Sequence, residues 1–400
     1  MNTIPNNPIM KNSVLTPNQE VPSIEKTYST EAFLALVHEL GKEFEKRAAQ
    51  HDQNDQFVDQ NYVVLKRYRI FTALIPTQFG GLGQSHSDVA NFLRTLAQYC
   101  GSTALALSMH QHLVGVNVWK HLNGKGGEAV LQRVAKEQII LVSTGARDWL
   151  DSNGEMRKVK GGYILNAYKA FASQSIIGDV FVTSAPYHDP EKGPVVLHFP
   201  VPASAEGVTV KDSWYTLGMR STGSHGVEFK EVFVPESAVG LERPQGEPHM
   251  VYNLVLTVAM PLIMAVYTGI AEAAAQKALG TARARKQSAT YLPQLIGEMN
   301  NLLVNARVMF QDMVRICNDF DFTPSFEGAH GTLSRKVMVT KSVIGTVEKA
   351  MEIVGGQGFF RAYGMERLFR DIQASHYHPL PEKEQQQFTG CYLLKDASSI

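Results

Sequence analysis

Residues 225–235 (HGVEFKEVFVP) and 251–271 (VYNLVLTVAMPLIMAVYTGIA) mark the point at which the chain changes from one kind of structure to another. The first segment alternates apolar and polar side chains, which is typical of a β-strand with one buried face. The second carries no charge, and its helical pattern continues past Glu272 and Lys277 to Arg285. A sheet therefore gives way to a long helix between the two segments.

The uncharged run 251–271 is long enough to cross a bilayer, so it is a candidate transmembrane helix by length and composition. However, no symmetrical aromatic or Lys/Arg anchors bracket it, and the helical pattern runs on into charged sequence. A helix that is apolar all round is also typical of the central rod of a large soluble bundle. We favour the buried-core interpretation and expect no membrane association.

Upstream of this helix, the sequence predicts a compact antiparallel β-barrel or sandwich. Short runs rich in Val, Phe and Tyr alternate with Gly, Pro and Asp turns. The runs are 161–168, 179–187, 194–202, 207–214 and 225–235.

Helical patterns flank the predicted sheet on both sides. Near the N-terminus, Phe33, Val37, Leu40 and Phe44 recur at the spacing of one apolar helix stripe. The pattern is helical as far as about Ala135. On the other side, the predicted helices cover 252–285, 292–320, 333–354 and 365–377, which suits a helix bundle.

We therefore predict an α+β fold in four parts. They are a flexible N-terminal tail (1–28), an N-terminal helical domain (29–137), a central antiparallel β-barrel (138–245) and a C-terminal four-helix bundle with a C-terminal extension (246–400).

Composition excludes several classes of protein. Lys+Arg and Asp+Glu both number 38, so the chain has no net charge to attract nucleic acid. Cys100, Cys317 and Cys391 are far apart and form no C-x-x-C motif, so we expect neither a disulfide framework nor a metal site. The N-terminus lacks a cationic start followed by an apolar run, so we expect no signal peptide and a cytoplasmic location.

Four short motifs occur in a fixed order along these elements. The most specific is Trp214-x-x-Leu217-Gly218-Met219-Arg220-Ser221-Thr222, followed by Val232-Phe233-Val234-Pro235, because it marks the return from sheet to bundle. The others are Ile75-Pro76-x-x-Phe79-Gly80-Gly81, Gly101-Ser102-Thr103-Ala104-Leu105 with His110, and Gly355-Gly356-Gln357-Gly358-Phe359 with Glu366-Arg367 and Arg370-Asp371. Together they resemble the acyl-CoA dehydrogenase superfamily of flavoproteins over about residues 30–380.

The resemblance implies a site for the adenosine diphosphate of FAD at Gly355 and Gly356. From the residues alone, glycines that close a helix are either a C-cap or a loop whose bare N–H groups meet a phosphate. Glu352 stands where many relatives have a Gln beside the adenine. Arg283 or Arg285 matches the arginine that reaches a neighbouring subunit's flavin, and the resemblance implies a homotetramer or homodimer.

The flavin ring is expected at the sheet. Phe171 and Ser173 resemble the segment in which an aromatic ring packs on the flavin and a hydroxyl bonds its N5, and in an extended strand both would share one face. Ser143 and Thr144 lie where the family binds the pyrimidine edge of the ring. The implied cofactor is FAD, or FMN if the protein is a monooxygenase.

The catalytic base that a dehydrogenase needs is absent from both positions where the family places it. These positions fall on Pro379 and Ala259, which cannot accept a proton. Glu382, a few residues further on, is a candidate for a displaced carboxylate base. His378 directly precedes the missing base, and the superfamily's flavin-dependent monooxygenase branch carries a histidine at this step and sometimes another from the first domain, where His110 stands.

His112 is the alternative to His110 as the first-domain histidine. Two residues apart on a helix, the two side chains point roughly 200° apart, so both cannot easily face one pocket. At least one of them is expected to be structural.

Three functions fit these residues. The first is an FAD-dependent dehydrogenase that removes an α-proton from an acyl thioester such as acyl-CoA and passes a β-hydride to flavin, with an electron-transfer flavoprotein as its partner. The second is a two-component monooxygenase that takes reduced flavin from a flavin reductase and uses O2 to oxidise a small apolar or aromatic substrate. The third is a non-catalytic flavoprotein.

Overall fold

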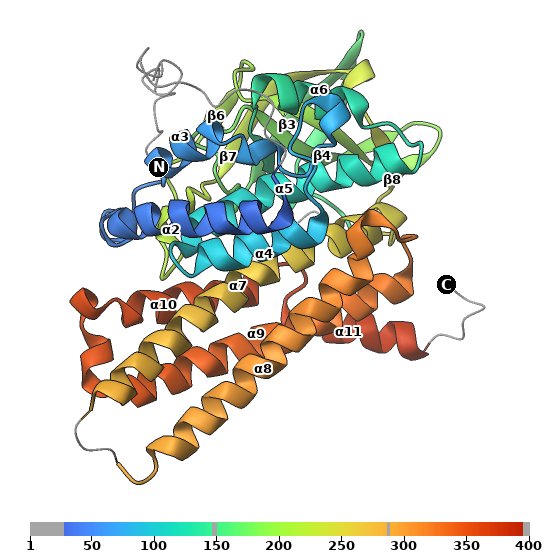
Figure 1. Ribbon diagram of the computed structural model, residues 1–400. Helices are drawn as coiled ribbons and strands as arrows, with labels where there is room; N and C mark the ends of the chain where they lie inside the picture. Colours follow the sequence, from blue (N-terminus) through green and yellow to red (C-terminus); the bar gives the residue numbers. More distant parts are fainter. Residues whose placement is uncertain (1–27, 146–149, 286–288, 395–400) are drawn as a thin grey trace, which may run out of the picture.

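The computed structural model describes residues 28–145, 150–285 and 289–394, in which helices surround one side of a sheet and a separate bundle lies below (Figure 1). Except for Tyr28, the predicted tail lies outside the described residues, as does the end of the C-terminal extension (395–400). The described segments follow the predicted order of helices, sheet and helices.

The N-terminal part consists of helices that bury one face each. They are α2 (Thr30–Gln53), α3 (Asp59–Arg67), α4 (His86–Ala97), α5 (Gly101–Leu122) and α6 (Glu128–Glu137). The predicted stripe of α2 is buried. Ser85 and Asp88 form a reciprocal capping box that starts α4, so the backbone N–H groups of both residues have partners. Helix α5 is buried on almost every side and reaches the sheet.

Eight strands form the central sheet in the part of the chain that the structure describes. They are β1 (Leu141–Ser143), β2 (Glu155–Val159), β3 (Gly162–Lys169), β4 (Val180–Asp189), β5 (Gly193–Pro202), β6 (Val208–Val210), β7 (Val227–Pro235) and β8 (Leu241–Pro244). The order is β6-β7-β3-β2-β4-β5-β8, with β1 beside β4.

Two strand pairings differ from the prediction of a wholly antiparallel sheet. Strands β1 and β2 both pair with β4 in parallel. The hairpin from β2 to β3 reverses the chain, and β4 then returns beside β2 instead of β3, so β2 and β4 run the same way. A period-two pattern indicates a strand but not its neighbours, and the sequence alone therefore missed this arrangement.

The C-terminal part is a bundle built on one long helix. Its helices are α7 (Met250–Ala284), α8 (Leu292–Cys317), α9 (Phe326–Val354), α10 (Met365–Ile372) and α11 (Glu382–Leu394). Helix α7 packs against α8 and α9 on one side and against α4 and α5 on the other (Figure 1). The predicted fold class, with helices at both ends of a central sheet, is confirmed.

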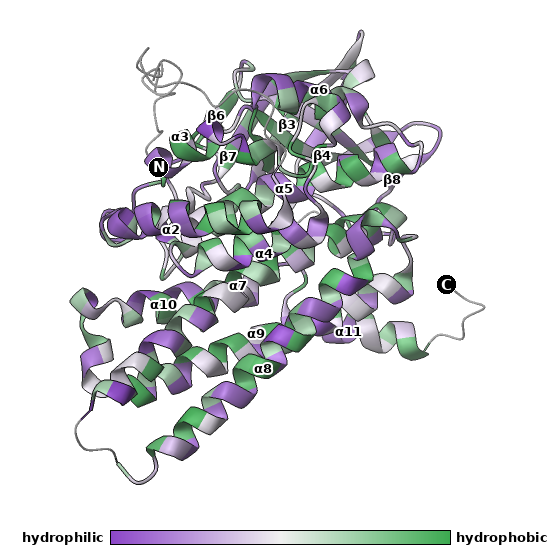
Figure 2. Cartoon of the chain, in the orientation of Figure 1, coloured by the Kyte–Doolittle hydropathy of each residue, from purple (hydrophilic) through white to green (hydrophobic). Residues whose placement is uncertain are grey.

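Helix α7 is the one described helix that is long and apolar enough to cross a membrane, and 94% of its most apolar window is buried inside the protein. Along α8, by contrast, hydrophobic and hydrophilic residues alternate (Figure 2). The prediction that 251–271 is a core helix is confirmed, because each side of α7 has a neighbour to pack against.

A buried network joins all three parts. The Asp371 carboxylate of α10 accepts a hydrogen bond of 2.6 Å from the backbone N–H of Met219. A side chain at Gly218 would lie 2.2 Å from the carbonyl oxygen of Arg370, so only glycine permits this approach. The Arg370 guanidinium donates to both carboxylate oxygens of Asp52, on α2, at 3.0 and 2.6 Å. This network fixes α10 against the motif that ends the sheet.

We expect Asp52→Ala to lower the free energy of unfolding by about 2 kcal/mol, because Arg370 loses two charge-assisted hydrogen bonds and keeps only the Glu366 carboxylate, 2.6 Å from its Nε, as an ionic partner among the described residues. Urea unfolding measures the change. Asp55→Ala is the control, since Asp55 lies 3.8 Å from Arg220 in a more exposed pair and should cost less than about 1 kcal/mol. Equal effects of the two substitutions would contradict the assigned role of Asp52.

Candidate active site

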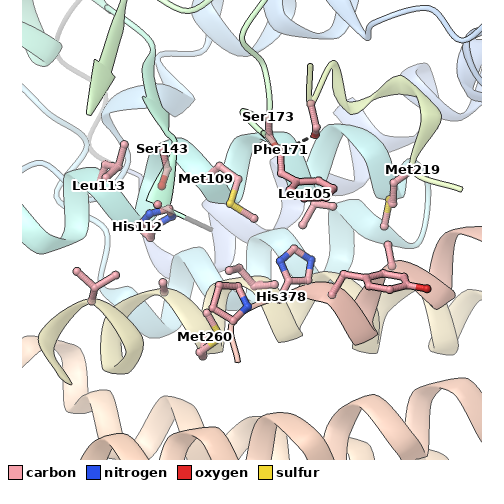
Figure 3. Close-up of a pocket in the computed structure, with 18 of the residues that line it drawn as sticks. Leu105, Met109, His112, Leu113, Ser143, Phe171, Ser173, Met219, Met260 and His378 are labelled. Carbon is pink, nitrogen blue, oxygen red and sulfur yellow. Dashed lines mark hydrogen bonds between the residues drawn. The ribbon is translucent and has the colours of Figure 1, made fainter. Parts of the chain in front are cut away.

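A cavity of about 510 Å³ lies where α5, α7, the sheet and the segment after α10 meet. Its lining is mainly apolar and includes Leu105, Met109, Met260 and Ile263. Figure 3 shows Met109 and Met260 on different helices, with Phe171 drawn near Met109 and His378 nearer to Met260. A largely apolar cavity with a few convergent polar groups is the usual form of a small-molecule site.

The ionisable side chains of the described cavity lining are imidazoles, phenols and one guanidinium; the phenols are Tyr252, Tyr267 and Tyr377. His112, His198 and His378 line the cavity, together with Arg370, whose guanidinium is engaged by Asp52. None of the described lining residues is an Asp or a Glu. Pro379 and Ala259, the two positions at which the family would place a carboxylate, both line the cavity.

His378 follows the 3₁₀ turn Gln373–Tyr377 and is held by Tyr267 of α7. The Tyr267 hydroxyl and His378 Nε2 are 2.5 Å apart. Burial raises the pKa of Tyr267 well above its usual value, so the phenol keeps its proton. Because no other acceptor contacts this buried hydroxyl in the described structure, we assign the phenol as the donor to Nε2, which places the imidazole proton on Nδ1.

The imidazole of His378 is neutral near pH 7. Burial, with a contribution from the Lys336 ammonium, lowers the pKa of His378 to about 3. Lys336 is itself buried in α9, and its Nζ donates to the carbonyl oxygen of Leu380 at 3.1 Å. Burial lowers the pKa of Lys336 to about 8. The hydrogen bond from Lys336 to Leu380 thus holds the loop that carries His378 against α9.

His112 presents a hydrogen-bond acceptor to the cavity, whereas His378 has a donor that Tyr267 does not engage. Its Nδ1 lies 3.3 Å from the carbonyl oxygen of Ser108, one turn earlier in α5, so the proton is on Nδ1. Nε2 is therefore a hydrogen-bond acceptor on a ring that lines the cavity beside Ser143 (Figure 3). Burial lowers the pKa of His112 to about 4, so it too is neutral.

His110, which the sequence put forward as a catalytic candidate, is absent from the cavity lining. Its Nδ1 accepts from the backbone N–H of Leu141 at 3.1 Å, and its Nε2 donates to the carbonyl oxygen of Phe71 at 2.8 Å. Both ring nitrogens are thus used to join α5 to β1 and to the turn at Phe71. Of the two histidines, the structure turns His112 toward the cavity and His110 away from it.

Phe171 and Ser173 both line the cavity, but not as neighbours on an extended strand. Strand β3 ends at Lys169, and Phe171 adopts a left-handed conformation (φ 59°) and is 44% exposed. Its ring lies 6.0 Å from that of Trp214, edge to face. The turn, and not the strand pleat, brings the two side chains to one site.

A chain of hydroxyl groups sets the polarity of Ser173. Thr222 donates to the carbonyl oxygen of Met219 at 2.9 Å, so it accepts from Ser224, 2.7 Å away. Ser224 has then used its single proton, and Ser173, 2.8 Å away, must donate to it. Ser173 consequently presents oxygen lone pairs to a ligand in the cavity.

Ser143 and Thr144, predicted to meet one edge of the ring, face different ways. Ser143 lines the cavity, whereas Thr144 is buried and donates to Thr183 Oγ1 at 2.8 Å. The rest of that loop, 146–149, lies outside the described residues.

The remaining predicted site residues lie outside the cavity lining. Glu382 begins α11 and binds Lys341 at 2.8 Å, an interaction that lowers its pKa. At the far end of α9, Arg285 donates to the carbonyl oxygens of Ile353 and Val354.

The remaining residues predicted to contact the adenosine diphosphate of FAD or a neighbouring subunit's flavin are surface residues near the end of α9. Glu352 binds Lys349 at 3.1 Å, Arg283 is exposed, and a side chain added at Gly356 would meet no atom within 4 Å. The structure therefore divides the predicted cofactor residues into a group in the cavity and a group at the exposed end of the bundle.

Tyr267, Lys336 and His198 were not found from the sequence. Tyr267 carried a usable signal, since a buried tyrosine in an uncharged helix needs a partner for its hydroxyl. Lys336 and His198 are a lysine and a histidine in ordinary helix and strand patterns, and nothing local distinguishes them.

Comparison with known proteins identifies the family to which the chain belongs. The family profiles "Acyl-CoA dehydrogenase, N-terminal domain" and "Acyl-CoA dehydrogenase, C-terminal domain" match residues 27–138 and 262–381. The chain belongs to the acyl-CoA dehydrogenase family. The resemblance inferred from the motifs is confirmed, and a flavin cofactor, FAD or FMN, agrees with this membership.

Similar proteins carry different activities. The chain is 27% identical over 372 residues to a putative acyl-CoA dehydrogenase of Bacillus subtilis (87% of this chain, 92% of the relative). It is 26% identical over 373 residues to an amino sugar nitrososynthase of Streptomyces peucetius (88% and 91%). The solved complex of a dibenzothiophene monooxygenase of Paenibacillus with FMN and indole superposes with a TM-score of 0.77 at 22% identity, covering 90% of this chain and 97% of that one.

We expect His110→Leu and His112→Leu to have opposite consequences. His110→Leu leaves two buried backbone groups without partners and should lower the free energy of unfolding by about 2 kcal/mol, with flavin affinity unchanged. His112→Leu should cost less than about 1 kcal/mol, because it removes one long hydrogen bond, but should weaken binding of ligands with a donor group. Urea unfolding and ligand titration measure both. A stable His110→Leu variant that loses ligand affinity would reverse the assignment.

Proposed function

We propose that the protein is a flavin-dependent monooxygenase that receives reduced flavin from a separate reductase and oxidises a small apolar or aromatic substrate with O2. The observation that carries this proposal is the set of ionisable groups in the cavity. Among the described lining residues, imidazoles are present and carboxylates are absent. Removal of an α-proton from an acyl thioester needs a carboxylate or a comparable base at the substrate, and both usual positions hold residues that cannot titrate.

The residues of the cavity fit a flavin. Phe171 lines the cavity with its ring edge to face with that of Trp214, and aromatic side chains of this kind suit contact with a flat ring. The lone pairs of Ser173 suit a ring N–H donor, and of the two redox states only reduced flavin carries a proton on N5. When bound, reduced flavin supplies the electrons that activate O2. The apolar lining excludes water from the reacting atoms.

His112 and His378 would act on the substrate in complementary ways. The Nε2 lone pair of His112 accepts a hydrogen bond from a substrate O–H or N–H and so orients the substrate. The Nδ1–H of His378 donates to an oxygen at the reacting centre, while Tyr267 holds Nε2 from behind. An anion in the cavity raises the pKa of His378 from its low value, because an opposite charge favours the imidazolium form.

The exposed end of the bundle bears on the choice between FMN and FAD. Arg285, Glu352, Gly355 and Gly356 lie outside the cavity lining, so the cavity residues alone suit the ring system, and an adenosine diphosphate would need a second contact surface. Phe359 and Phe360, next to the glycine turn, are 83% and 68% exposed. Exposed apolar rings of this kind are typical of an interface between subunits, which supports assembly into a homodimer or homotetramer. We also propose a cytoplasmic location.

The acyl-CoA dehydrogenase activity is the second candidate. It is favoured by membership of the family and by the Bacillus subtilis relative, whose name gives that activity as putative. Glu382 would have to supply the base, but its carboxylate binds Lys341 and does not line the cavity.

Anaerobic spectroscopy with two substrates tests the proposal. Reduced FMN should bind more tightly than oxidised FMN, and admission of O2 in the presence of indole as probe should oxidise the flavin and yield a product heavier by one oxygen atom. Protein loaded with FAD should keep its oxidised spectrum when butyryl-CoA or octanoyl-CoA is added without O2. Bleaching by an acyl-CoA, with no oxygenated product in the first arm, would replace this proposal with the dehydrogenase.

We expect His378→Ala to lower turnover by about 10² to 10⁴, the usual effect of removing a proton-transferring side chain, with flavin affinity retained. Glu382→Gln is the matched control and should stay within a few-fold of the wild type, since this carboxylate faces Lys341. Rapid-mixing kinetics with reduced FMN and O2 measure both variants. Loss of turnover in Glu382→Gln but not in His378→Ala would identify a displaced carboxylate base.

A further inference from the structure

The turn that carries the proposed flavin contacts Phe171 and Ser173 is held by His225 and its neighbour in the chain. The backbone N–H of Ala172, between the two contacts, donates to the carbonyl oxygen of His225 at 3.1 Å. The Ser224 hydroxyl lies 2.8 Å from that of Ser173. The main chain at residues 224–225 therefore determines where this turn enters the cavity.

The side chain of the same histidine holds a second segment of the cavity wall. His225 is 6% exposed, and its Nδ1 accepts hydrogen bonds from the backbone N–H groups of Ser213 and Trp214, at 3.1 and 3.2 Å. An imidazole nitrogen that accepts carries no proton, so the neutral ring of His225 is protonated on Nε2. Trp214 lines the cavity, and its ring centroid lies 6.0 Å from that of Phe171.

We propose that His225 positions two parts of the flavin site against each other: its carbonyl oxygen holds the turn at Phe171, and its unprotonated Nδ1 holds the segment at Trp214. The inference rests on the proposed contact between flavin and Phe171, and it does not depend on the oxygenation reaction. A proton on Nδ1 would set a third N–H group against those of Ser213 and Trp214 and would leave both of these donors without their acceptor. The imidazolium form therefore separates the two segments and weakens flavin binding.

The ionisable groups around His225 set the direction of the pH dependence. Burial lowers the pKa of His225 from its usual value, and the Asp212 carboxylate opposes this shift. Glu228 of β7 is paired with Lys211 at 2.6 Å, and the Tyr168 hydroxyl of β3 lies beside the glycine that follows the histidine. Flavin affinity should thus be constant above the usual histidine pKa of about 6.5 and should fall below it, as the pH passes through the pKa of His225.

Riboflavin titrations at different pH values test the inference. Riboflavin is the ligand because it lacks the phosphate of FMN, which titrates in the same range. From about pH 8 to about pH 5, wild-type affinity, measured by flavin fluorescence, should first be flat and then fall about tenfold per pH unit, as expected when release of the ligand takes up one proton.

Two substitutions separate the acceptor from its titration. His225→Asn keeps an acceptor, Oδ1, at the side-chain position of Nδ1 but cannot titrate. Its riboflavin affinity should stay within a few-fold of the wild type at the upper end of the range and should not fall at the lower end. His225→Leu removes the acceptor and should bind riboflavin at least about tenfold more weakly at every pH.

Three results would overturn the inference. One is a wild-type affinity that does not change with pH. Another is a fall that persists in His225→Asn, which would assign the titration to a different group, such as Asp371, whose pKa burial raises to about 6. The third is a lower thermal midpoint in His225→Leu with riboflavin affinity unchanged, which would make the histidine purely structural.

The riboflavin titrations need no turnover, so they are independent of the oxygenation experiment. If no oxygenated product forms but the pH dependence of affinity is present in the wild type and absent in His225→Asn, the proposed activity is rejected and the role of His225 stands.

Discussion

The placement of the Asp371 carboxylate against the backbone of Met219 determines where the cavity forms. The bond is buried, and loss of water raises the pKa of Asp371 to about 6 even though the Met219 N–H favours the charged form. The bare backbone of Gly218 allows the two segments to touch. Gly218 and Met219 form part of the cavity wall, and the short turn after α10 leads to His378. The contact between Asp371 and Met219 therefore positions both this part of the wall and the His378 imidazole.

The cavity draws its polar groups from elements that belong to different parts of the chain. Helix α5 provides His112, and α7 provides Tyr267, which holds His378. In each case a neighbouring atom fixes which ring nitrogen carries the proton: a backbone carbonyl for His112 and a phenol for His378. Low pKa values keep both rings neutral, so their donor and acceptor roles come from geometry and do not change with pH near neutrality.

Much of the fold could be predicted from local sequence, whereas the site depended on long-range contacts. Helix α7 was evident because its apolar run is continuous, and Phe171 and Ser173 were found through a motif. Period and spacing could not show that β4 returns beside β2. Nor could they show that α11 begins at Glu382 and directs that side chain to Lys341.

The two central histidine assignments illustrate the same limit. Helix geometry predicted that His110 and His112 could not easily face one pocket together, but which of them faces it depended on the backbone of Phe71 and Leu141, far away in sequence. Tyr267 and His378 are separated by 111 positions. A sequence pattern shows what a residue can do, and the partner that fixes its protonation is visible only after the chain has folded.

The electrostatics of the cavity favour giving a proton over taking one. An imidazole whose pKa lies near 3 is a weak base, so abstraction of a proton from carbon by His378 is strongly disfavoured compared with an ordinary histidine. A negative charge that develops in the cavity raises this pKa and draws a proton onto the imidazole, because the apolar wall that destabilises an isolated imidazolium also strengthens its attraction to a nearby anion. A site of this kind suits a reaction in which negative charge develops on oxygen and is then protonated, and it suits poorly a reaction that begins with the loss of a proton from the substrate.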